Sequence, residues 1–149
     1  MRPYNTEEEF MNDYEPGVRC TPRRVLIVDD NDSVLRVFQR VLQFSLPECK
    51  TDLASNGAEA VRLFGLHHYA VILMDLRMPI LDGESTFRMI EDMCRSRNWD
   101  EPSVVFCSGY IPSDNILDHI RDHSANCCLL HKPVDNRTLV ASIRSRLAA

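Results

Sequence analysis

Short apolar runs recur along the chain from residue 24 onward and are separated by longer segments of mixed polarity. The clearest are Val25–Val28 and Val71–Met74, which are rich in β-branched residues and show no polar alternation. Continuous apolar runs of this length are typical of strands that are buried on both faces. We therefore predict strands at residues 25–28, 71–74, 104–107 and 128–130. Residues 49–53 are a further, brief strand candidate.

The segments between these runs carry apolar residues at helical spacing. Between residues 34 and 42, for example, six apolar side chains fall on one helical stripe, and Asp30 or Asp32 could cap this helix. Further helices are predicted around residues 60–64, over 84–95, from Ser113 or Asp114 to about His123, and over 136–147. Strands that alternate with helices predict an α/β fold: a doubly wound, five-stranded parallel sheet with five helices on its two faces.

The first 22 residues differ from the rest of the chain. They contain an acidic cluster, Glu7–Glu9, and Thr6 with Glu9 fits a capping box. We predict either a tail or a short helix over residues 6–14. The chain is thus divided into a segment 1–22 and a domain 23–149.

Length and composition limit the class of protein. The 149 residues suit one domain, and 17 basic against 22 acidic residues give a net charge of −5, which argues against a nucleic-acid binder. The sequence shows neither a run of 18 apolar residues nor a secretory signal, so no membrane partner and a cytoplasmic location are expected. The six cysteines include no C-x-x-C pair and are expected to be free thiols. Similarly, His67 and His68 are expected to be solvated or helix-capping residues rather than metal ligands.

Polar residues follow four of the predicted strands. Asp29 and Asp30 follow the first, Asp75 the third, Ser108 the fourth and Lys132 the fifth. The carboxyl ends of parallel strands meet at one edge of the sheet, where ligands bind. Clustered carboxylates repel one another unless a dication such as Mg²⁺ lies among them, and a hydroxyl and an ammonium suit a phosphoryl group. Asp75 is then a candidate nucleophile, because carboxylates form acyl phosphates.

The segments VLIVDD (25–30), LMDLRMPILDG (73–83), FCSGY (106–110) and HKPV (131–134) resemble the signature of bacterial two-component response-regulator receiver domains. The resemblance covers residues 23–149 and implies a flavodoxin-like fold with strand order 2-1-3-4-5. It implies that Asp75 is the phosphoacceptor. It also implies that Mg²⁺ is held by Asp29, Asp30, Asp75 and the backbone carbonyl of Arg77.

The same resemblance assigns roles to the later motifs. Ser108 is similar to the switch hydroxyl that moves to bond the phosphoryl oxygen, and Lys132 to the lysine that pairs with that group. Pro133 matches a proline that often follows a cis peptide bond. Arg77 and Tyr110 lie at two positions that tune the lifetime of the aspartyl phosphate. Since neither is a suitable general base, we expect them to shield the phosphoryl group.

Two features depart from the family pattern. Leu129 stands where many receivers carry a Tyr or Phe whose ring turns inward on activation, so that rotation cannot be the readout here. No output domain follows residue 149, which suggests a stand-alone receiver or one separated from its output domain.

These observations favour a signalling domain that receives its phosphoryl group from a histidine kinase or a histidine phosphotransfer protein and then binds an unidentified output partner. They leave open a phosphorylation-dependent homodimer, and they do not predict an enzyme. One alternative is a Mg²⁺-dependent phosphatase of haloacid-dehalogenase type, but that class needs a second Asp at the position of Arg77. Another is a degenerate receiver that only docks, but this would require an altered acceptor site.

Overall fold

The computed structural model describes residues 21–147, which form five strands and five helices in strict alternation. Every predicted strand and helix within this range is present, and the helix predicted over residues 6–14 lies outside it. No helix within 21–147 combines the length and apolar character needed to cross a bilayer. The elements are β1 (Thr21–Val28), α2 (Asp32–Ser45), β2 (Lys50–Ala54), α3 (Gly57–His67), β3 (Tyr69–Asp75), α4 (Gly83–Arg97), β4 (Ser103–Ser108), α5 (Asp114–Asp122), β5 (Cys127–His131) and α6 (Asn136–Leu147).

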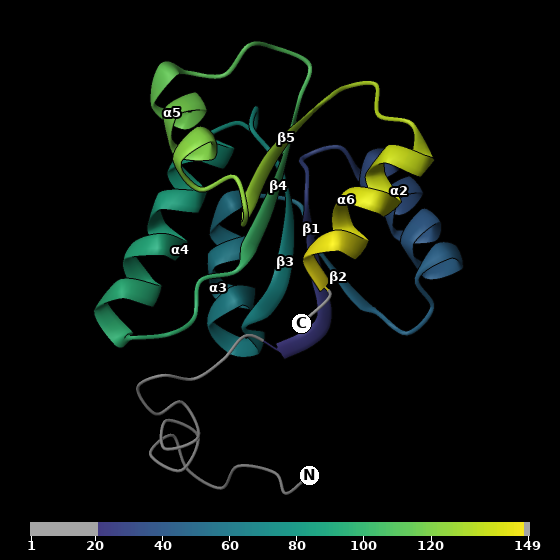
Figure 1. Cartoon of the computed structure of the whole chain (residues 1–149), viewed down its shortest axis with the longest axis horizontal. Coiled ribbons are helices and arrows are strands. Elements are labelled where there is room, and N and C mark those ends of the chain that lie inside the picture. The colour runs from purple at the N-terminus through teal and green to yellow at the C-terminus, as the bar shows by residue number, and fades with distance from the viewer. Residues whose placement is uncertain (1–20, 148–149) are drawn as a thin grey trace, which may run out of the picture.

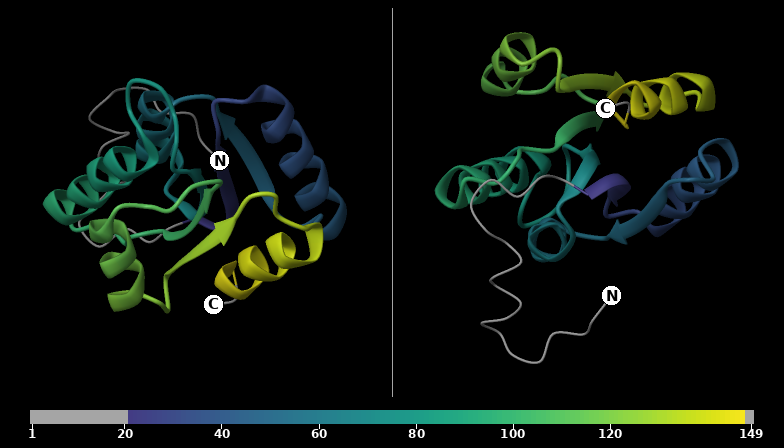
Figure 2. Two further views of the ribbon diagram at one scale, coloured as in Figure 1. Left: turned by 90° about the horizontal axis from the view of Figure 1, so that it is seen from above. Right: turned by 60° about the horizontal axis from the view of Figure 1, so that its bottom comes forward.

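The strands form one parallel sheet in the order β2-β1-β3-β4-β5, which confirms the predicted topology. Helices α2 and α6 lie on one side of the sheet, and α3, α4 and α5 lie on the other (Figure 1). Figure 2 shows the same layers from above, with the sheet between the two groups of helices. Strand β1 begins at Thr21, two residues before the domain start placed at residue 23.

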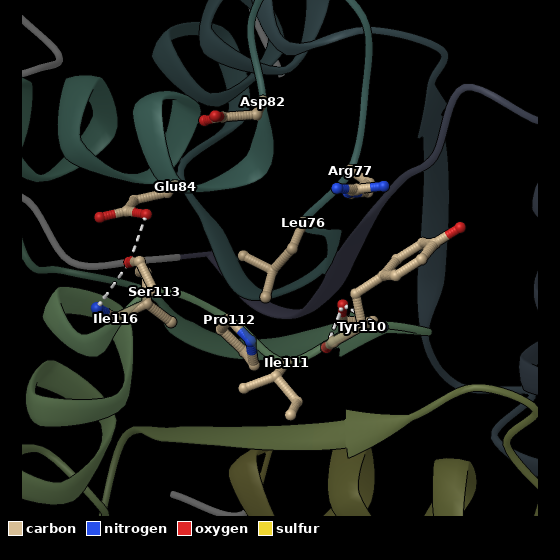
Figure 3. A pocket seen from close by; sticks show the side chains of 10 residues that line it. Leu76, Arg77, Asp82, Glu84, Tyr110, Ile111, Pro112, Ser113 and Ile116 are labelled. Carbon is tan, nitrogen blue, oxygen red and sulfur yellow. Dashed lines mark hydrogen bonds between the residues drawn. The ribbon is translucent and has the colours of Figure 1, made fainter.

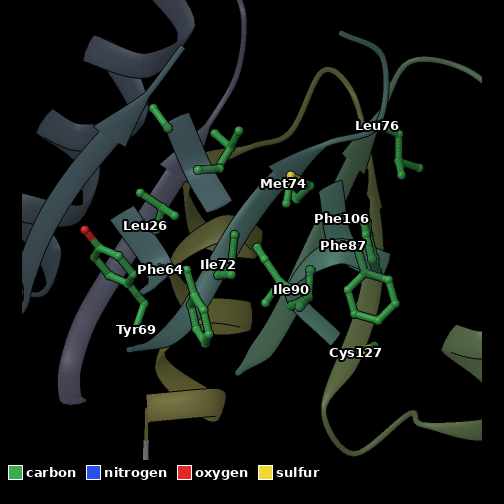
Figure 4. Packing of buried hydrophobic residues seen from close by; sticks show 14 of the residues in the cluster. Leu26, Phe64, Tyr69, Ile72, Met74, Leu76, Phe87, Ile90, Phe106 and Cys127 are labelled. Carbon is green, nitrogen blue, oxygen red and sulfur yellow. The ribbon is translucent and has the colours of Figure 1, made fainter. Parts of the chain in front are cut away.

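Two apolar clusters form the core, one on each face of the sheet. Alternate residues of one strand supply opposite clusters. Ile72 and Met74 face α3 and α4 (Figure 4), whereas Val71 and Leu73 face α2 and α6. All four side chains are essentially inaccessible to solvent. Burying a side chain of this size contributes about 1.5–3 kcal/mol, so both faces of the central strand hold the domain together.

Polar side chains cap the helices, and one cap corrects the sequence prediction. The N-cap of α2 is Asn31, not Asp30 or Asp32, because Asn31 has extended backbone and its Oδ1 accepts from Ser33 N (2.9 Å) and Val34 N (3.2 Å). Asp30 therefore lies outside the cap and its carboxylate is available to the neighbouring site. Asp32 begins the helix itself, where its charge suits the helix dipole.

The histidine pair at the end of α3 was predicted to be solvated or helix-capping. His68 is the C-cap, in the left-handed region with φ 50°, and its backbone N–H donates to Phe64 O. His68 is therefore a helix-capping residue, which is one of the two roles expected for it, and its ring is buried and meets Trp99 edge-on at 4.2 Å between centroids. The neighbouring His67 is half-buried against Tyr69.

A polar cluster ties the three strands on the β2 side of the sheet. The carboxylate of Asp52 on β2 accepts from Tyr69 Oη (2.7 Å) on β3 and from Arg24 Nη2 (2.9 Å) on β1. Burial alone would raise the pKa of Asp52. The hydrogen bonds from Tyr69 and Arg24 outweigh it and hold that pKa below its ordinary value.

The five described cysteines are all free, as predicted, and Cys20 lies outside the described residues. Four of them are buried. Burial raises the pKa of Cys94 and of Cys107 to about 12, which keeps both thiols protonated and unreactive.

Candidate functional site

The register of the sheet places the predicted site residues at one level. Val28 pairs with Met74, so Asp29 and Asp75 follow at neighbouring strand ends. Asp75 pairs with Cys107, and Ser108 is the next residue of β4. Ser108 in turn pairs with His131, and Lys132 follows. The carboxyl edge therefore brings together all the strand-end residues singled out in the sequence.

Three carboxylates form a cluster at this edge. One oxygen from each of Asp29, Asp30 and Asp75 lies within 4.8 Å of the others. Asp29 and Asp75 are buried, whereas Asp30 is exposed. Backbone N–H groups orient the buried pair: Asn31 N donates to Asp29 Oδ1 (2.9 Å) and Arg77 N donates to Asp75 Oδ1 (3.3 Å).

Lys132 is the cation that reaches the cluster. Its Nζ donates to Asp29 Oδ2 at 2.8 Å and lies 3.5 Å from Asp75 Oδ1. Burial alone would lower the pKa of Lys132, but the hydrogen bond to Asp29 and the charge of Asp75 raise it. Burial and the charge of Asp29 raise the pKa of Asp75, and Lys132 offsets only part of that rise. The single positive charge of Lys132 thus does not balance the negative charges of the three carboxylates.

The cluster fits a hard dication. Its donors are carboxylate oxygens, which Mg²⁺ prefers, and two of the three carboxylates are buried near a strand end rather than spread over solvent. The pKa of Asp75 is raised because burial and the charge of Asp29 disfavour its ionised form. A second positive charge beside the carboxylate would stabilise that form. The residues present here therefore suit that ion.

A close backbone contact fixes the end of β3. Gly83 N donates to Leu76 O (3.0 Å), which folds the loop after Asp75 back onto the strand. A Cβ at position 83 would lie 2.2 Å from Asp75 O and 2.8 Å from Leu76 Cα. Asp82, just before it, caps α4 by accepting from Ser85 N at 2.8 Å. The Asp82–Gly83 pair therefore has a structural role: Asp82 caps the start of α4, and Gly83 leaves space for the backbone of Asp75.

Ser108 is buried and its hydroxyl is already engaged. Oγ donates to Tyr110 O (2.8 Å) and accepts from Tyr110 N (3.0 Å). The hydroxyl would have to leave Tyr110 O before it could donate to a group on Asp75.

Arg77 and Tyr110, which follow Asp75 and Ser108 by two residues, are brought together. The guanidinium carbon of Arg77 lies 4.0 Å from the centroid of the Tyr110 ring, a cation–π contact that joins the two loops. Both side chains are exposed, so the contact covers the surface between these loops rather than the core.

The last strand and the loop after it complete the edge. Leu129 is half-buried and packs against the cluster on the α3–α4 side, in the place where the resemblance expects an aromatic ring. The Lys132–Pro133 peptide bond is cis, as the resemblance implies. Beside Lys132, an open groove of about 540 Å³ runs between α2 and the loop before α6, lined mainly by Val34, Val37, Phe38, Pro133 and Val134.

One polar contact at this edge was not foreseen. Ser113, predicted only as a possible cap of α5, also donates from Oγ to Glu84 Oε2 on α4 at 2.8 Å. The two residues are 29 positions apart, and no spacing in the sequence links them. Only the packing of α4 beside α5 could reveal this pair.

Comparison with known proteins shows a family to which the sequence is similar. The model of the response regulator receiver domain matches residues 25–144. Regulatory protein AtoC of Escherichia coli is 36% identical over 98 residues, which cover 66% of this chain and 20% of AtoC. Response regulator Rre1 of Synechocystis is 30% identical over 128 residues, covering 85% of this chain and 52% of Rre1. The chain thus spans about half the length of Rre1 and a fifth of AtoC.

Solved structures share the fold. The chemotaxis protein CheY4 of Vibrio cholerae superposes with a TM-score of 0.66 at 21% identity, over 83% of this chain and 98% of that one. At this identity the likeness concerns the order of the strands and the packing of the helices. It agrees with the parallel sheet and its carboxyl-edge site as described above.

Proposed function

This chain belongs to the family of response regulator receiver domains, and we propose on that premise that it is a signalling domain that accepts a phosphoryl group on Asp75. One observation carries the assignment: Asp75 ends a buried strand and lies beside the carboxylates of Asp29 and Asp30 and the ammonium of Lys132. Phosphorylation of an aspartate and binding of Mg²⁺ are typical of the family. We place the domain at residues 23–149.

The proposed chemistry is a phosphoryl transfer between two protein side chains. A carboxylate oxygen of Asp75 forms a bond to phosphorus as the bond from phosphorus to a histidine nitrogen of the donor breaks, and the departing imidazole keeps the electron pair. Lys132, already 3.5 Å from Asp75 Oδ1, supplies a positive charge for the phosphoryl oxygens. The cation matters because the transferred phosphoryl group itself carries about −1.5 to −2 charges and lies in an acidic site.

Mg²⁺ would be held by Asp29, Asp30, Asp75 and the backbone carbonyl of Arg77. When bound, it supplies positive charge between the carboxylates and the incoming phosphoryl group. The protein's own part is orientation: Asn31 N and Arg77 N hold the two buried carboxylates, and Gly83 seats the backbone at Asp75.

The donor is a histidine kinase or a histidine phosphotransfer protein. Such a partner must cover the mouth of the site, and the apolar groove beside Lys132 offers a surface for it, with Val37 half exposed at 54%. After transfer, Ser108 turns to the phosphoryl group and the surface around α5 and β5 changes its affinity for an output partner or for a second copy of the chain. In this scheme the domain turns over no metabolite.

A phosphatase of haloacid-dehalogenase type is not supported. The position that would hold its general acid is Arg77, which is exposed and stacked on Tyr110. A guanidinium stays protonated and cannot exchange a proton with a leaving group near neutral pH.

Intact-mass measurement after incubation with acetyl phosphate and Mg²⁺ tests the proposal. The wild type should gain one phosphoryl group, and Asp75→Asn should gain none. Asp82→Asn is the matched control, because it removes a carboxylate from the same loop while asparagine caps a helix equally well. Equal labelling of Asp75→Asn and wild type would reject Asp75 as the acceptor.

A further inference from the structure

The loop that joins β4 to α5 is held at each end by a serine hydroxyl. At its start, Ser108 Oγ bonds both the N–H and the carbonyl of Tyr110. At its end, Ser113 Oγ donates to Glu84 Oε2 on α4 and accepts from Ile116 N at 3.3 Å (Figure 3). The hydroxyl hydrogen of Ser113 therefore bonds helix α4, while its oxygen caps the first turn of helix α5.

Between these two anchors the loop makes little contact with the core. Tyr110 and Ile111 are 59% and 88% exposed, and a Cβ added at Gly109 would meet nothing within 4 Å. Beneath the loop lies a pocket of about 150 Å³, bounded by Leu76 on one side and Ile116 on the other (Figure 3). Because the loop has so few buried contacts, the hydrogen bonds at its two ends largely determine its conformation.

Glu84 is well placed to fix one of those end points. It lies in the first turn of α4, and Arg88 binds its other carboxylate oxygen, Oε1, at 3.2 Å. Helix α4 is seated by Gly83 directly on the backbone of Asp75. The start of α5 is thus tied to the same rigid element that positions the acceptor.

We propose that Glu84 is a positioning residue of the phosphorylation switch. By binding Ser113 it holds the β4–α5 loop in the conformation described here, in which Ser108 bonds Tyr110, and so opposes the turn of Ser108 toward Asp75. This rests on the proposed function, because the turn matters only if Asp75 carries a phosphoryl group. Loss of the Glu84–Ser113 bond makes activation easier.

The test uses two substitutions at one position that leave the charge unchanged. Ser113→Gly removes the hydroxyl donor but keeps most of the helix cap, and Ser113→Asn keeps a cap and supplies an amide donor for Glu84. With Mg²⁺ present, the apparent dissociation constant for beryllofluoride should fall about three- to tenfold in Ser113→Gly. Ser113→Asn should match the wild type.

Two controls separate the bond from general loosening. In a chain that already carries Glu84→Ala, Ser113→Gly should have no further effect, because the partner is gone. Ser55→Gly removes a similar serine–glutamate contact, Ser55 Oγ to Glu59 Oε2 at 3.4 Å, from the loop before α3, and should leave the affinity unchanged. Unchanged affinity in Ser113→Gly, or equal tightening in Ser55→Gly, would overturn the proposal.

A second measurement does not depend on phosphorylation. Amide hydrogen exchange at Tyr110 and Ile111, without any phosphoryl donor, should be faster in Ser113→Gly than in the wild type or Ser113→Asn. If the wild type takes up no phosphate and no beryllofluoride, the proposed function fails, while the exchange rates still decide whether Glu84 holds the loop. Equal exchange in all three proteins would show that it does not.

Discussion

Replacing Gly83 by alanine should both destabilise the domain and disturb the acceptor. The added Cβ would lie 2.2 Å from Asp75 O and 2.8 Å from Leu76 Cα, and both of these atoms belong to the backbone at the end of a buried strand. An ordinary carbon contact is about 3.5–4.0 Å, so the chain must yield by about 1 Å. Overpacking of this kind costs about 1–3 kcal/mol, and we expect the upper end because no flexible side chain can move aside.

The measurement is urea unfolding followed by circular dichroism, together with the melting temperature. A loss of about 3 kcal/mol corresponds to a decrease of about 6–12 °C for a domain of this size. The variant should also label more slowly with acetyl phosphate, because Asp75 moves with its carbonyl group.

Gly109→Ala is the matched control in the neighbouring loop. Nothing lies within 4 Å of a Cβ at position 109, so this substitution should be neutral or stabilise by up to about 1 kcal/mol through the unfolded chain. If Gly83→Ala unfolds at the same urea concentration as Gly109→Ala, the close approach of α4 to β3 is not what the glycine provides.

Three further results are expected. Lys132→Ala should weaken the conformational response to beryllofluoride more than it weakens Mg²⁺ binding, since the ammonium pairs with phosphoryl oxygens but repels the metal; an unchanged response would contradict its role. Tyr110→Ala combined with Arg77→Asn should shorten the lifetime of labelled aspartyl phosphate, measured by phosphate release, and an equal or longer lifetime would reject shielding. Asp52 has a pKa below its unfolded value, so its stabilisation is complete above about pH 4 and is lost as the pH falls through the folded-state pKa. Asp52→Asn should therefore unfold at lower urea concentration than wild type near neutral pH, and the difference should shrink in acid; a difference independent of pH would remove Asp52 as its cause.

The positions of four strands could be predicted from the sequence because each contains a continuous apolar run, and the structure lengthens these four; β2, with the sequence KTDLA, is the exception. Strand β3, for instance, runs from Tyr69 to Asp75, whereas the run that marks it is Val71–Met74. The polar residues at strand ends could be read as one site because parallel strands share a carboxyl edge. For Asp29, Asp75 and Lys132 that reasoning leads to contacts that the structure contains.

The rest depended on contacts between residues far apart in sequence. Nothing local distinguishes Asn31 from its acidic neighbours as the cap of α2, because asparagine and aspartate cap equally well. The burial of His68 follows from the arrival of Trp99 at the end of α4, which no pattern near residue 68 indicates. The Glu84–Ser113 bond likewise forms only because the N-terminal ends of α4 and α5 lie side by side in the fold.

The sheet separates the two apolar clusters so completely that each can be altered without the other. Side chains such as Val71 and Ile72 are neighbours in sequence but belong to different layers. Substitutions in the two layers that lie more than about 7–10 Å apart and share no partner have nearly additive effects on stability. Substitutions in the apolar cluster under α2 and α6, beside the apolar groove, would leave the packing of α4 and α5 intact. In a domain built this way, the surfaces on the two sides of the sheet can change through separate series of substitutions.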